Sequence, residues 1–130
     1  MEKTNAKTIM LVDDDSFLLD MYAMKFKARG WDPITLSNSE EALNKLREGY
    51  EPTVLVVDII MPKIDGIAFY KEVKSKNLAK SSVKIVLTNQ GEKADLDKVA
   101  DLGLDGYIIK ALNTPTEVVE KVLSISSNKS

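Results

Sequence analysis

Short apolar runs alternate with amphipathic segments along the chain. Three of the apolar runs are unbroken and rich in β-branched residues, which is typical of strands covered on both faces of a sheet. One shorter run follows Pro33, and because proline cannot donate to a β-ladder, this run predicts an edge strand. The five predicted strands are Thr8–Val12, Ile34–Leu36, Thr53–Val57, Val83–Leu87 and Tyr107–Ile109.

Helical periodicity fills the intervals between these runs. Apolar residues from Leu19 to Phe26 recur at i, i+3, i+4 and i+7, a stripe that predicts a helix ending at Gly30. A second helix is expected from Ser39 to Gly49, and Thr114-Pro115-Thr116-Glu117 has the form of a capping box that begins the last helix. The third and fourth helices are predicted from the stripes Gly66, Phe69, Tyr70, Val73 and Leu96, Val99, Ala100, Gly103.

Five strand–helix units in series predict an α/β fold, because right-handed crossovers place helices on both faces of a parallel sheet. We expect a doubly wound, five-stranded parallel sheet of order 2-1-3-4-5, as in flavodoxin-like (βα)5 folds. A length of 130 residues suits one domain, which we assign to residues 8–124. Residues 1–7 are expected to form a flexible N-terminal segment, and residues 125–130 a polar C-terminal tail that frays.

Composition narrows the function classes. The formal net charge of −2 provides no basic field for nucleic acid. No apolar stretch approaches the roughly 18–20 residues that span a bilayer, and Met1–Lys7 has no secretory apolar core, so we expect a cytoplasmic protein. The chain has no cysteine and no histidine, which excludes disulfides, thiolate catalysis and imidazole acid–base chemistry. Carboxylates remain as hard ligands, and these favour Mg²⁺, Mn²⁺ or Ca²⁺ over zinc.

Carboxylates follow two of the predicted strands. Asp58 comes directly after the third strand, and Asp13-Asp14-Asp15 follow the first. The carboxyl ends of parallel strands share one edge of the sheet, so Asp13, Asp14 and Asp58 are expected to converge in a crevice there. Three carboxylates in one crevice repel each other unless a cation is bound. Asp15 is the expected N-cap of the first helix, and an alternative is that the whole acidic triplet only caps that helix.

Two further strand ends add to this edge. The fourth strand stops at Thr88, a hydroxyl, and the fifth stops at Lys110, an ammonium. Each has a structural alternative, since Thr88 can satisfy a turn and Lys110 can extend its stem to water. Together with the acids they suit phosphoryl transfer, in which cation, ammonium and hydroxyl share the charge of the phosphoryl oxygens. Asp58 is the natural nucleophile of such a site.

At this point the chain resembles the receiver domain of two-component response regulators over nearly its whole length. The motifs that carry the resemblance are Val12-Asp13-Asp14, Asp58 with Met61-Pro62-x-x-Asp65-Gly66, Thr88, and Gly106-Tyr107-x-x-Lys110.

The resemblance implies a role for each site residue. Asp58 would accept a phosphoryl group from a phosphohistidine on a sensor histidine kinase or a histidine phosphotransfer protein, which fits a chain without histidine. Magnesium, with manganese as an alternative, would be ligated directly by Asp14 and Asp58, through water by Asp13, and by the backbone carbonyl of Ile60. Lys110 and Thr88 would each contact the phosphoryl group. The Tyr107 side chain would swing inward.

The resemblance further implies a signalling phosphoacceptor rather than an enzyme. Autophosphorylation from small donors is expected, and the switch would change the surface of helix 4, strand 5 and helix 5 for a downstream protein. Slow self-dephosphorylation is our hypothesis, because Ile60 cannot orient the attacking water and Gln90 cannot act as a charged base. A monomer or a weak dimer is expected, the latter through the mixed charges Lys93, Asp95, Asp97, Lys98 and Asp101.

Two positions depart from the family pattern. Ala111 follows Lys110 where the family usually has proline after a cis bond, and a non-proline cis bond costs about 2.5–4 kcal/mol. Asn89 is larger than the small residue that often follows the threonine, which predicts either a hindered threonine shift or an added hydrogen bond to the phosphate.

Three alternatives stay open at this level. A pseudo-receiver that docks partners without phosphorylation is favoured by Lys110-Ala111. An aspartyl phosphatase of the haloacid-dehalogenase type needs a second acid two residues after its nucleophile, where this chain has Ile60. A flavodoxin-like or dinucleotide-binding protein would need a first turn that accepts phosphate, whereas Asp13–Ser16 contains no glycine and three acids.

Overall fold

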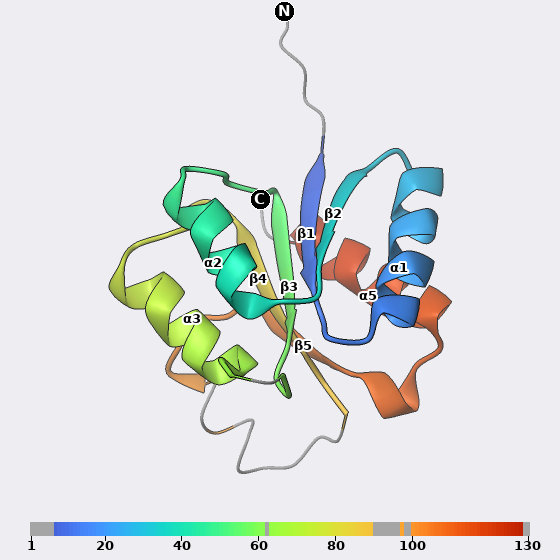
Figure 1. Ribbon diagram of the computed structural model, residues 1–130. Coiled ribbons are helices and arrows are strands. Elements are labelled where there is room, and N and C mark those ends of the chain that lie inside the picture. Colours follow the sequence, from blue (N-terminus) through green and yellow to red (C-terminus); the bar gives the residue numbers. More distant parts are fainter. Residues whose placement is uncertain (1–6, 62, 90–96, 98–99, 129–130) are drawn as a thin grey trace, which may run out of the picture.

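The computed structural model describes residues 7–61, 63–89, 97 and 100–128. Within them lies a five-stranded parallel sheet of order β2-β1-β3-β4-β5, as predicted (Figure 1). The strands are β1 (Thr8–Val12), β2 (Asp32–Leu36), β3 (Val54–Asp58), β4 (Val83–Thr88) and β5 (Gly106–Ile109). The helices are α1 (Ser16–Ala28), α2 (Ser39–Arg47), α3 (Gly66–Ser75), the short 3₁₀ turn η1 (Lys110–Leu112) and α5 (Pro115–Asn128).

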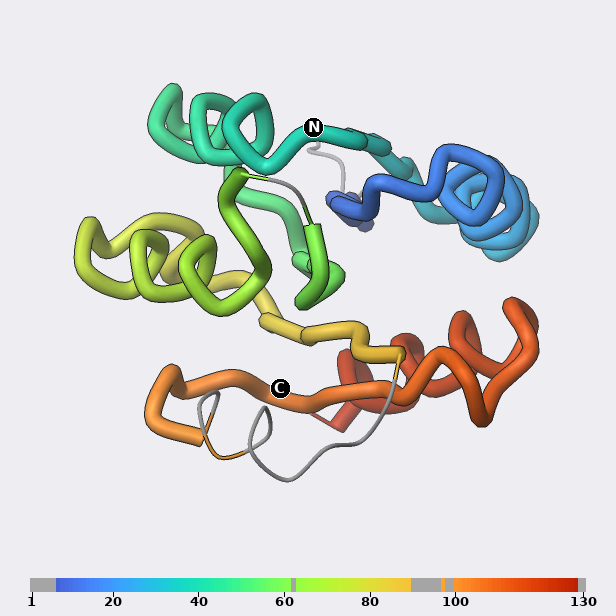
Figure 2. Tube along the Cα trace, turned by 60° about the horizontal axis from the view of Figure 1, so that its bottom comes forward, coloured from blue at the N-terminus to red at the C-terminus, as the bar shows by residue number. Residues whose placement is uncertain are grey.

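The helices cover the two faces of the sheet in pairs. In both views α2 and α3 lie on one side and α1 and α5 on the other (Figures 1 and 2). Successive residues of each central strand therefore enter different cores: Met10 and Val12 pack with α2 and α3, whereas Ile9 and Leu11 pack with α1 and α5. This explains why β1 and β3 are apolar without alternation, since both faces are buried.

The ends of the strands are set by the register. Asp58 is the last residue of β3 and pairs with Leu87, and Thr88 is the last residue of β4 and pairs with Ile109. The strands that deliver the candidate site residues therefore end at one edge of the sheet, which Figure 2 brings forward. The predicted strands were too short by one or two residues at β2, β4 and β5, and β3 is shifted by one so that it includes Asp58.

The helix ends follow local hydrogen-bonding chemistry. Asp15 is the N-cap of α1, as predicted, and accepts from the backbone N–H of Leu18 (3.1 Å). The capping box at α5 is also present, with Glu117 N–H donating to the Thr114 hydroxyl (3.1 Å) and Thr114 N–H donating to the Glu117 carboxylate (2.8 Å). Helix α2 begins at Ser39 as predicted, but the capping side chain is that of Asn38.

The prediction that residues 125–130 form a fraying tail is wrong for residues 125–128. Helix α5 continues to Asn128, and Ile125 packs against the core formed by α1, α5 and the sheet. A Cβ at Gly106 would lie 2.7 Å from the Ile125 side chain, so glycine at the start of β5 lets this last turn approach the sheet. Tertiary packing overrides the polar composition of Ser124–Asn128 here.

Other predictions fall largely outside the described residues. The fourth predicted helix, Leu96–Gly103, is described only in part, and Asp97 and Ala100 within it are helical. Gln90, Lys93, Asp95 and Lys98 lie outside the described residues. In the part of the chain that is described, no helix combines the length and the apolar character needed to cross a bilayer.

Candidate phosphoacceptor and metal site

Three carboxylates meet at the carboxyl edge of the sheet. Asp13 follows β1 and is buried, Asp58 ends β3 and is buried, and Asp14 beside them is exposed. One oxygen from each of Asp13, Asp14 and Asp58 lies within 4.8 Å of the others. The structure therefore brings together the three acids that the strand-end pattern singled out. Two are held in the protein interior, and the third faces solvent.

Lys110 closes the inner side of this group. Its Nζ donates to Asp13 Oδ2 (2.9 Å) and to Asp58 Oδ2 (3.1 Å), and only 12% of its side chain is exposed. No peptide bond among the described residues is cis. The bond between Lys110 and Ala111 is therefore trans, and the Lys110 side chain contacts both carboxylates with the bond in this form. With three carboxylates and one ammonium, the cluster carries a net charge of −2 when all four groups are ionised.

The pKa values follow from burial and charge. Burial, with the neighbouring charge of Asp13, raises the pKa of Asp58 to about 6, although Lys110 acts in the opposite direction. For Lys110, burial lowers the pKa, but the hydrogen bond to Asp13 and the charges of Asp58 and Asp13 outweigh it and the pKa is raised. Lys110 is therefore a stable ammonium, and a divalent cation is the complement of the remaining negative charge.

Backbone hydrogen bonds hold the two ends of the segment between Asp58 and α3. Ile59 N–H donates to the carbonyl of Leu87 (2.8 Å), and Gly66 N–H donates to the carbonyl of Ile59 (2.7 Å). A Cβ at Gly66 would lie 2.5 Å from the carbonyl oxygen of Asp58, so only glycine allows α3 to begin this close to β3. Asp65 caps α3 by accepting from Ala68 N–H (2.8 Å).

A serine that sequence reasoning missed as a site residue also holds this loop. The buried Ser39 hydroxyl donates to the carbonyl of Ile64 (2.8 Å) and thereby ties the start of α2 to the loop between Asp58 and Asp65. The only signal in the sequence is a serine immediately after a helix cap, which by itself predicts no tertiary contact.

The two predicted switch residues occupy different environments. Thr88 is buried at the end of β4, on the same edge as the carboxylates. Tyr107 lies on β5, pairs with Val86 in the register, and has 51% of its surface exposed. The structure therefore places Thr88 at the sheet edge that bears the carboxylates, and Tyr107 at an exposed position on β5. Asn89, which follows Thr88 and differs from the small residue often found there in the family, is exposed.

Large apolar side chains near the site in sequence are exposed to solvent. Phe17 (71%) lies in the first turn of α1, Ile60 (59%) two residues after Asp58, and Leu112 (74%) at the end of η1. Each belongs to a segment that directly follows one of the acids or Lys110.

Comparison with known proteins places this site in a family. The response regulator receiver domain family matches residues 9–123. The alkaline phosphatase synthesis transcriptional regulatory protein PhoP of Bacillus subtilis is 34% identical over 119 residues, covering 92% of this chain and 48% of that protein. The phosphate regulon transcriptional regulatory protein PhoB of Escherichia coli is 27% identical over 120 residues, covering 92% and 52%. The chain thus spans about half the length of these curated relatives.

Solved structures agree on the fold. A CheY-like response regulator receiver domain protein from Methanospirillum hungatei has a TM-score of 0.84 at 22% identity, covering 95% of this chain and 96% of its own. A response regulator described as putative, from Chloroflexus aurantiacus, has a TM-score of 0.81 at 28% identity, with 95% and 99% covered.

The fold, the acidic edge and these matches define a class: a phosphoacceptor domain of two-component signalling. The chain belongs to the response regulator receiver domain family. Receiver domains are signalling phosphoacceptors that bind Mg²⁺ through an acidic cluster, and response regulators partner with histidine kinases. The cluster of Asp13, Asp14 and Asp58 is compatible with both Mg²⁺ and an aspartyl phosphate.

Proposed function

We propose that this receiver domain is switched by transfer of a phosphoryl group from a histidine kinase or phosphotransfer protein to Asp58. The observation that carries the proposal is the geometry of Asp58, a buried strand-end carboxylate paired with Lys110 and clustered with two further acids. A pKa of about 6 leaves Asp58 mostly ionised at pH 7 and above, as a nucleophile requires. A docking module without phosphorylation has no need of this costly set of charges.

The transfer step is a displacement at phosphorus. A carboxylate oxygen of Asp58 attacks the phosphorus of the partner's phosphohistidine and forms a P–O bond. The P–N bond breaks, and its electron pair stays on the imidazole nitrogen, which then takes up a proton. Lys110 moves its ammonium contact from the Asp58 carboxylate to a phosphoryl oxygen, and the Thr88 hydroxyl donates to another.

The acidic cluster is also the proposed metal site. Asp14 and Asp58 would hold Mg²⁺ directly, Asp13 through water, and the carbonyl of Ile60 would complete the protein ligands. The fit rests on charge and donor type, since three carboxylates against one ammonium leave a site that an oxygen-preferring dication matches. When bound, Mg²⁺ supplies neutralisation of the negative charge that gathers between Asp58 and the phosphoryl group.

The contact surface for the phosphodonor protein and the surface for the downstream protein are proposed from residues that are exposed. The exposed Phe17, Ile60 and Leu112 would contact the kinase or phosphotransfer protein while its phosphohistidine enters the crevice. After transfer, a shift of Thr88 toward the phosphate would open space into which Tyr107 turns from its half-exposed position on β5. The changed surface of β5 and α5 would then bind a downstream protein.

The test is phosphorylation by a small donor. We expect acetyl phosphate with Mg²⁺ to increase the intact mass by one phosphoryl group, and Asp58→Ala to abolish the increase. Asp14→Asn should slow it at limiting Mg²⁺, whereas Asp20→Asn, an exposed acid on α1, should leave it unchanged. Wild-type protein that stays unmodified with both the donor and a set of purified kinases would instead favour the docking module.

A further inference from the structure

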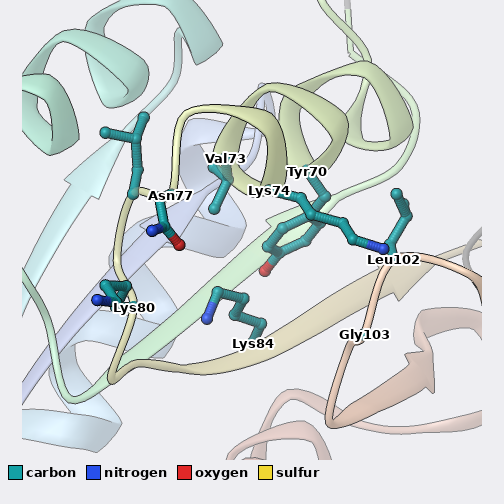
Figure 3. Close-up of a pocket in the computed structure, with 9 residues that line it drawn as sticks. Tyr70, Val73, Lys74, Asn77, Lys80, Lys84, Leu102 and Gly103 are labelled. Carbon is teal, nitrogen blue, oxygen red and sulfur yellow. The ribbon is translucent and has the colours of Figure 1, made fainter.

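A lysine at the opposite end of α3 from Asp58 contacts the turn that precedes β5. Lys74 lies in the last turn of α3, and its Nζ donates to the backbone carbonyl of Asp101 (2.7 Å). Figure 3 shows the Lys74 side chain leaving α3 and ending beside Leu102. We call residues 101–105 the pre-β5 segment, because β5 begins at Gly106. The contact therefore joins α3 to the segment that leads into β5.

The carbonyl that Lys74 contacts lies where a helical stretch ends. Ala100 is helical, residues 101–103 form a turn, and Gly103 has a φ of 69°, the left-handed conformation that commonly follows the last turn of a helix. The last carbonyls of a helix have no N–H partner within it, and they form the negative end of its dipole. An ammonium at the carbonyl of Asp101 therefore stabilises this helix end.

The pre-β5 segment is also anchored at other points. The Asp105 N–H donates to the Lys84 carbonyl (2.7 Å), and the Asp105 carboxylate accepts the Lys84 backbone N–H (2.7 Å). The Leu102 side chain is buried in the core beneath α2 and α3. A hollow of about 280 Å³, which Lys74, Leu102 and Gly103 help to line, lies between α3, β4 and this segment. The Lys74 contact is therefore made beside a gap in the packing, which leaves the segment room to move.

The first turn of α3 is packed directly against the candidate phosphoacceptor. Gly66, the first residue of α3, donates its N–H to the carbonyl of Ile59 (2.7 Å), and a Cβ at Gly66 would lie 2.5 Å from the carbonyl oxygen of Asp58. A helix of ten residues is about 15 Å long and transmits displacement as a rigid element. A shift of the backbone at Asp58 is therefore carried along α3 to Lys74.

We infer that Lys74 is a positioning residue of the phosphorylation switch: its contact with Asp101 holds the pre-β5 segment in the resting position and is lost in the switched one. The inference rests on the proposed function, because it concerns the state that follows phosphorylation of Asp58. Lys74 and Asp101 are both exposed, so their contact is weak enough for a switch to break. A contact made only in the resting state opposes the switch. Its removal therefore favours the switched state and any ligand that stabilises that state.

The experiment compares Lys74→Gln with Lys71→Gln, which removes the same charge from an exposed position on the same helix. Beryllofluoride with Mg²⁺ serves as the phosphoryl analogue, and NMR shifts of the Asp13 and Asp58 amides report its binding. We expect Lys74→Gln to lower the half-saturating beryllofluoride concentration about threefold and Lys71→Gln to leave it unchanged. Lys74→Arg keeps a cationic donor and should restore the wild-type value.

Amide hydrogen exchange without beryllofluoride tests the contact in the resting state. The Leu104 and Asp105 amides should exchange about threefold to tenfold faster in Lys74→Gln than in Lys71→Gln. Equal exchange in the two variants would overturn the inference. Faster exchange without tighter beryllofluoride binding would also overturn it, because Lys74 would then have a structural role alone. Wild-type protein that shows no shifts at Asp13 and Asp58 would overturn the proposed function, and this inference with it.

Discussion

The polar groups at the two edges of the sheet have different kinds of partners. At the amino edge, Thr8 and Thr53 exchange hydrogen bonds between each N–H and the other's hydroxyl (3.2 and 3.0 Å), and the buried Ser82 hydroxyl donates to the carbonyl of Pro52 (2.5 Å). At the carboxyl edge, two buried carboxylates share one ammonium. These amino-edge contacts join neutral groups, whereas the carboxyl edge keeps a net negative charge that a bound cation would offset.

This difference separates the contacts that stabilise the fold from the groups that serve the function. Saturated neutral contacts favour the fold at any ionic condition, and buried like charges oppose it until a cation binds. The carboxyl edge is therefore expected to respond to pH, metal and substitution, and the amino edge to respond to substitution alone.

The largest expected effect is the removal of charge at Asp58. In the unfolded chain an aspartate titrates near about 3.9, but in the fold the pKa of Asp58 is raised to about 6. The native state thus holds its proton to higher pH, so this group lowers stability as pH rises from about 4 to above 6, by up to about 3 kcal/mol. Asp58→Asn should raise the free energy of unfolding at pH 7.5 by about 1–3 kcal/mol and reduce its slope between pH 4.5 and 7.

Urea denaturation across that pH range measures this prediction. Magnesium gives an internal check, because at 100 times its Kd it should stabilise the wild type by about 2.7 kcal/mol and the Asp58→Asn variant by less. An unchanged pH slope in the variant would show that Asp58 is not the group that titrates.

The next prediction compares alanine substitutions of two glycines at opposite edges of the sheet. In Gly66→Ala the new methyl meets backbone atoms of Asp58 and Ile59 at 2.5 and 2.7 Å, whereas in Gly106→Ala it meets the flexible end of Ile125 at 2.7 Å. We expect Gly66→Ala to cost about 2 kcal/mol and to weaken Mg²⁺ binding about tenfold. Gly106→Ala should cost about 1 kcal/mol and leave Mg²⁺ affinity unchanged.

Calorimetric titration of Mg²⁺, paired with urea unfolding, separates the two glycines. Loss of metal affinity in proportion to lost stability in both variants would contradict the assignment of Gly66 to the site.

A smaller effect compares two buried serines with the same chemistry. Ser39 donates to the carbonyl of Ile64 at the carboxyl edge, and Ser82 donates to that of Pro52 at the amino edge. Each alanine variant leaves a carbonyl without its partner and should lose about 1–2 kcal/mol of stability. Ser39→Ala alone should also weaken Mg²⁺ binding about threefold, because the loop that bears Ile60 is less fixed. Equal Mg²⁺ affinities for Ser39→Ala and Ser82→Ala would limit Ser39 to a structural role.

The smallest expected effect concerns the lifetime of the phosphorylated state. Ile60→Asn introduces an amide that can orient a water two residues after Asp58, and we expect the phosphate to be lost about threefold to tenfold faster, or about 1 kcal/mol in barrier. Leu112→Asn, another exposed apolar residue near the site, is the matched control and should leave the lifetime unchanged. Decay followed by intact mass after removal of the donor gives both rates, and an unaltered rate in Ile60→Asn would refute the hypothesis of slow self-dephosphorylation.

The acidic cluster was predictable because it depends on topology. Once the strands are parallel and in the order 2-1-3-4-5, residues that follow β1 and β3 must share an edge, and Asp13, Asp14 and Asp58 do. The capping box at Thr114 was predictable for a different reason, since its contacts lie within four residues.

What escaped prediction depends on packing between distant segments. The hydrogen bond from Ser39 to Ile64 requires the final placement of α2 against the loop after β3. The last turn of α5 forms in a polar sequence because Ile125 fits over Gly106, a contact that no local propensity contains. The sequence also offered no means to tell that Asp13 is buried while its neighbour Asp14 is exposed.

The bridge made by Lys110 links the acidic cluster to α5 through a short segment of chain. Its ammonium acts as a built-in counterion at the acids, and its backbone begins η1, which leads through Asn113 and Thr114 into α5. Any incoming charge that competes for this ammonium therefore acts on the first residue of a short, direct linkage to a surface helix. Lys110 thus connects the acidic cluster with the segment that leads into α5.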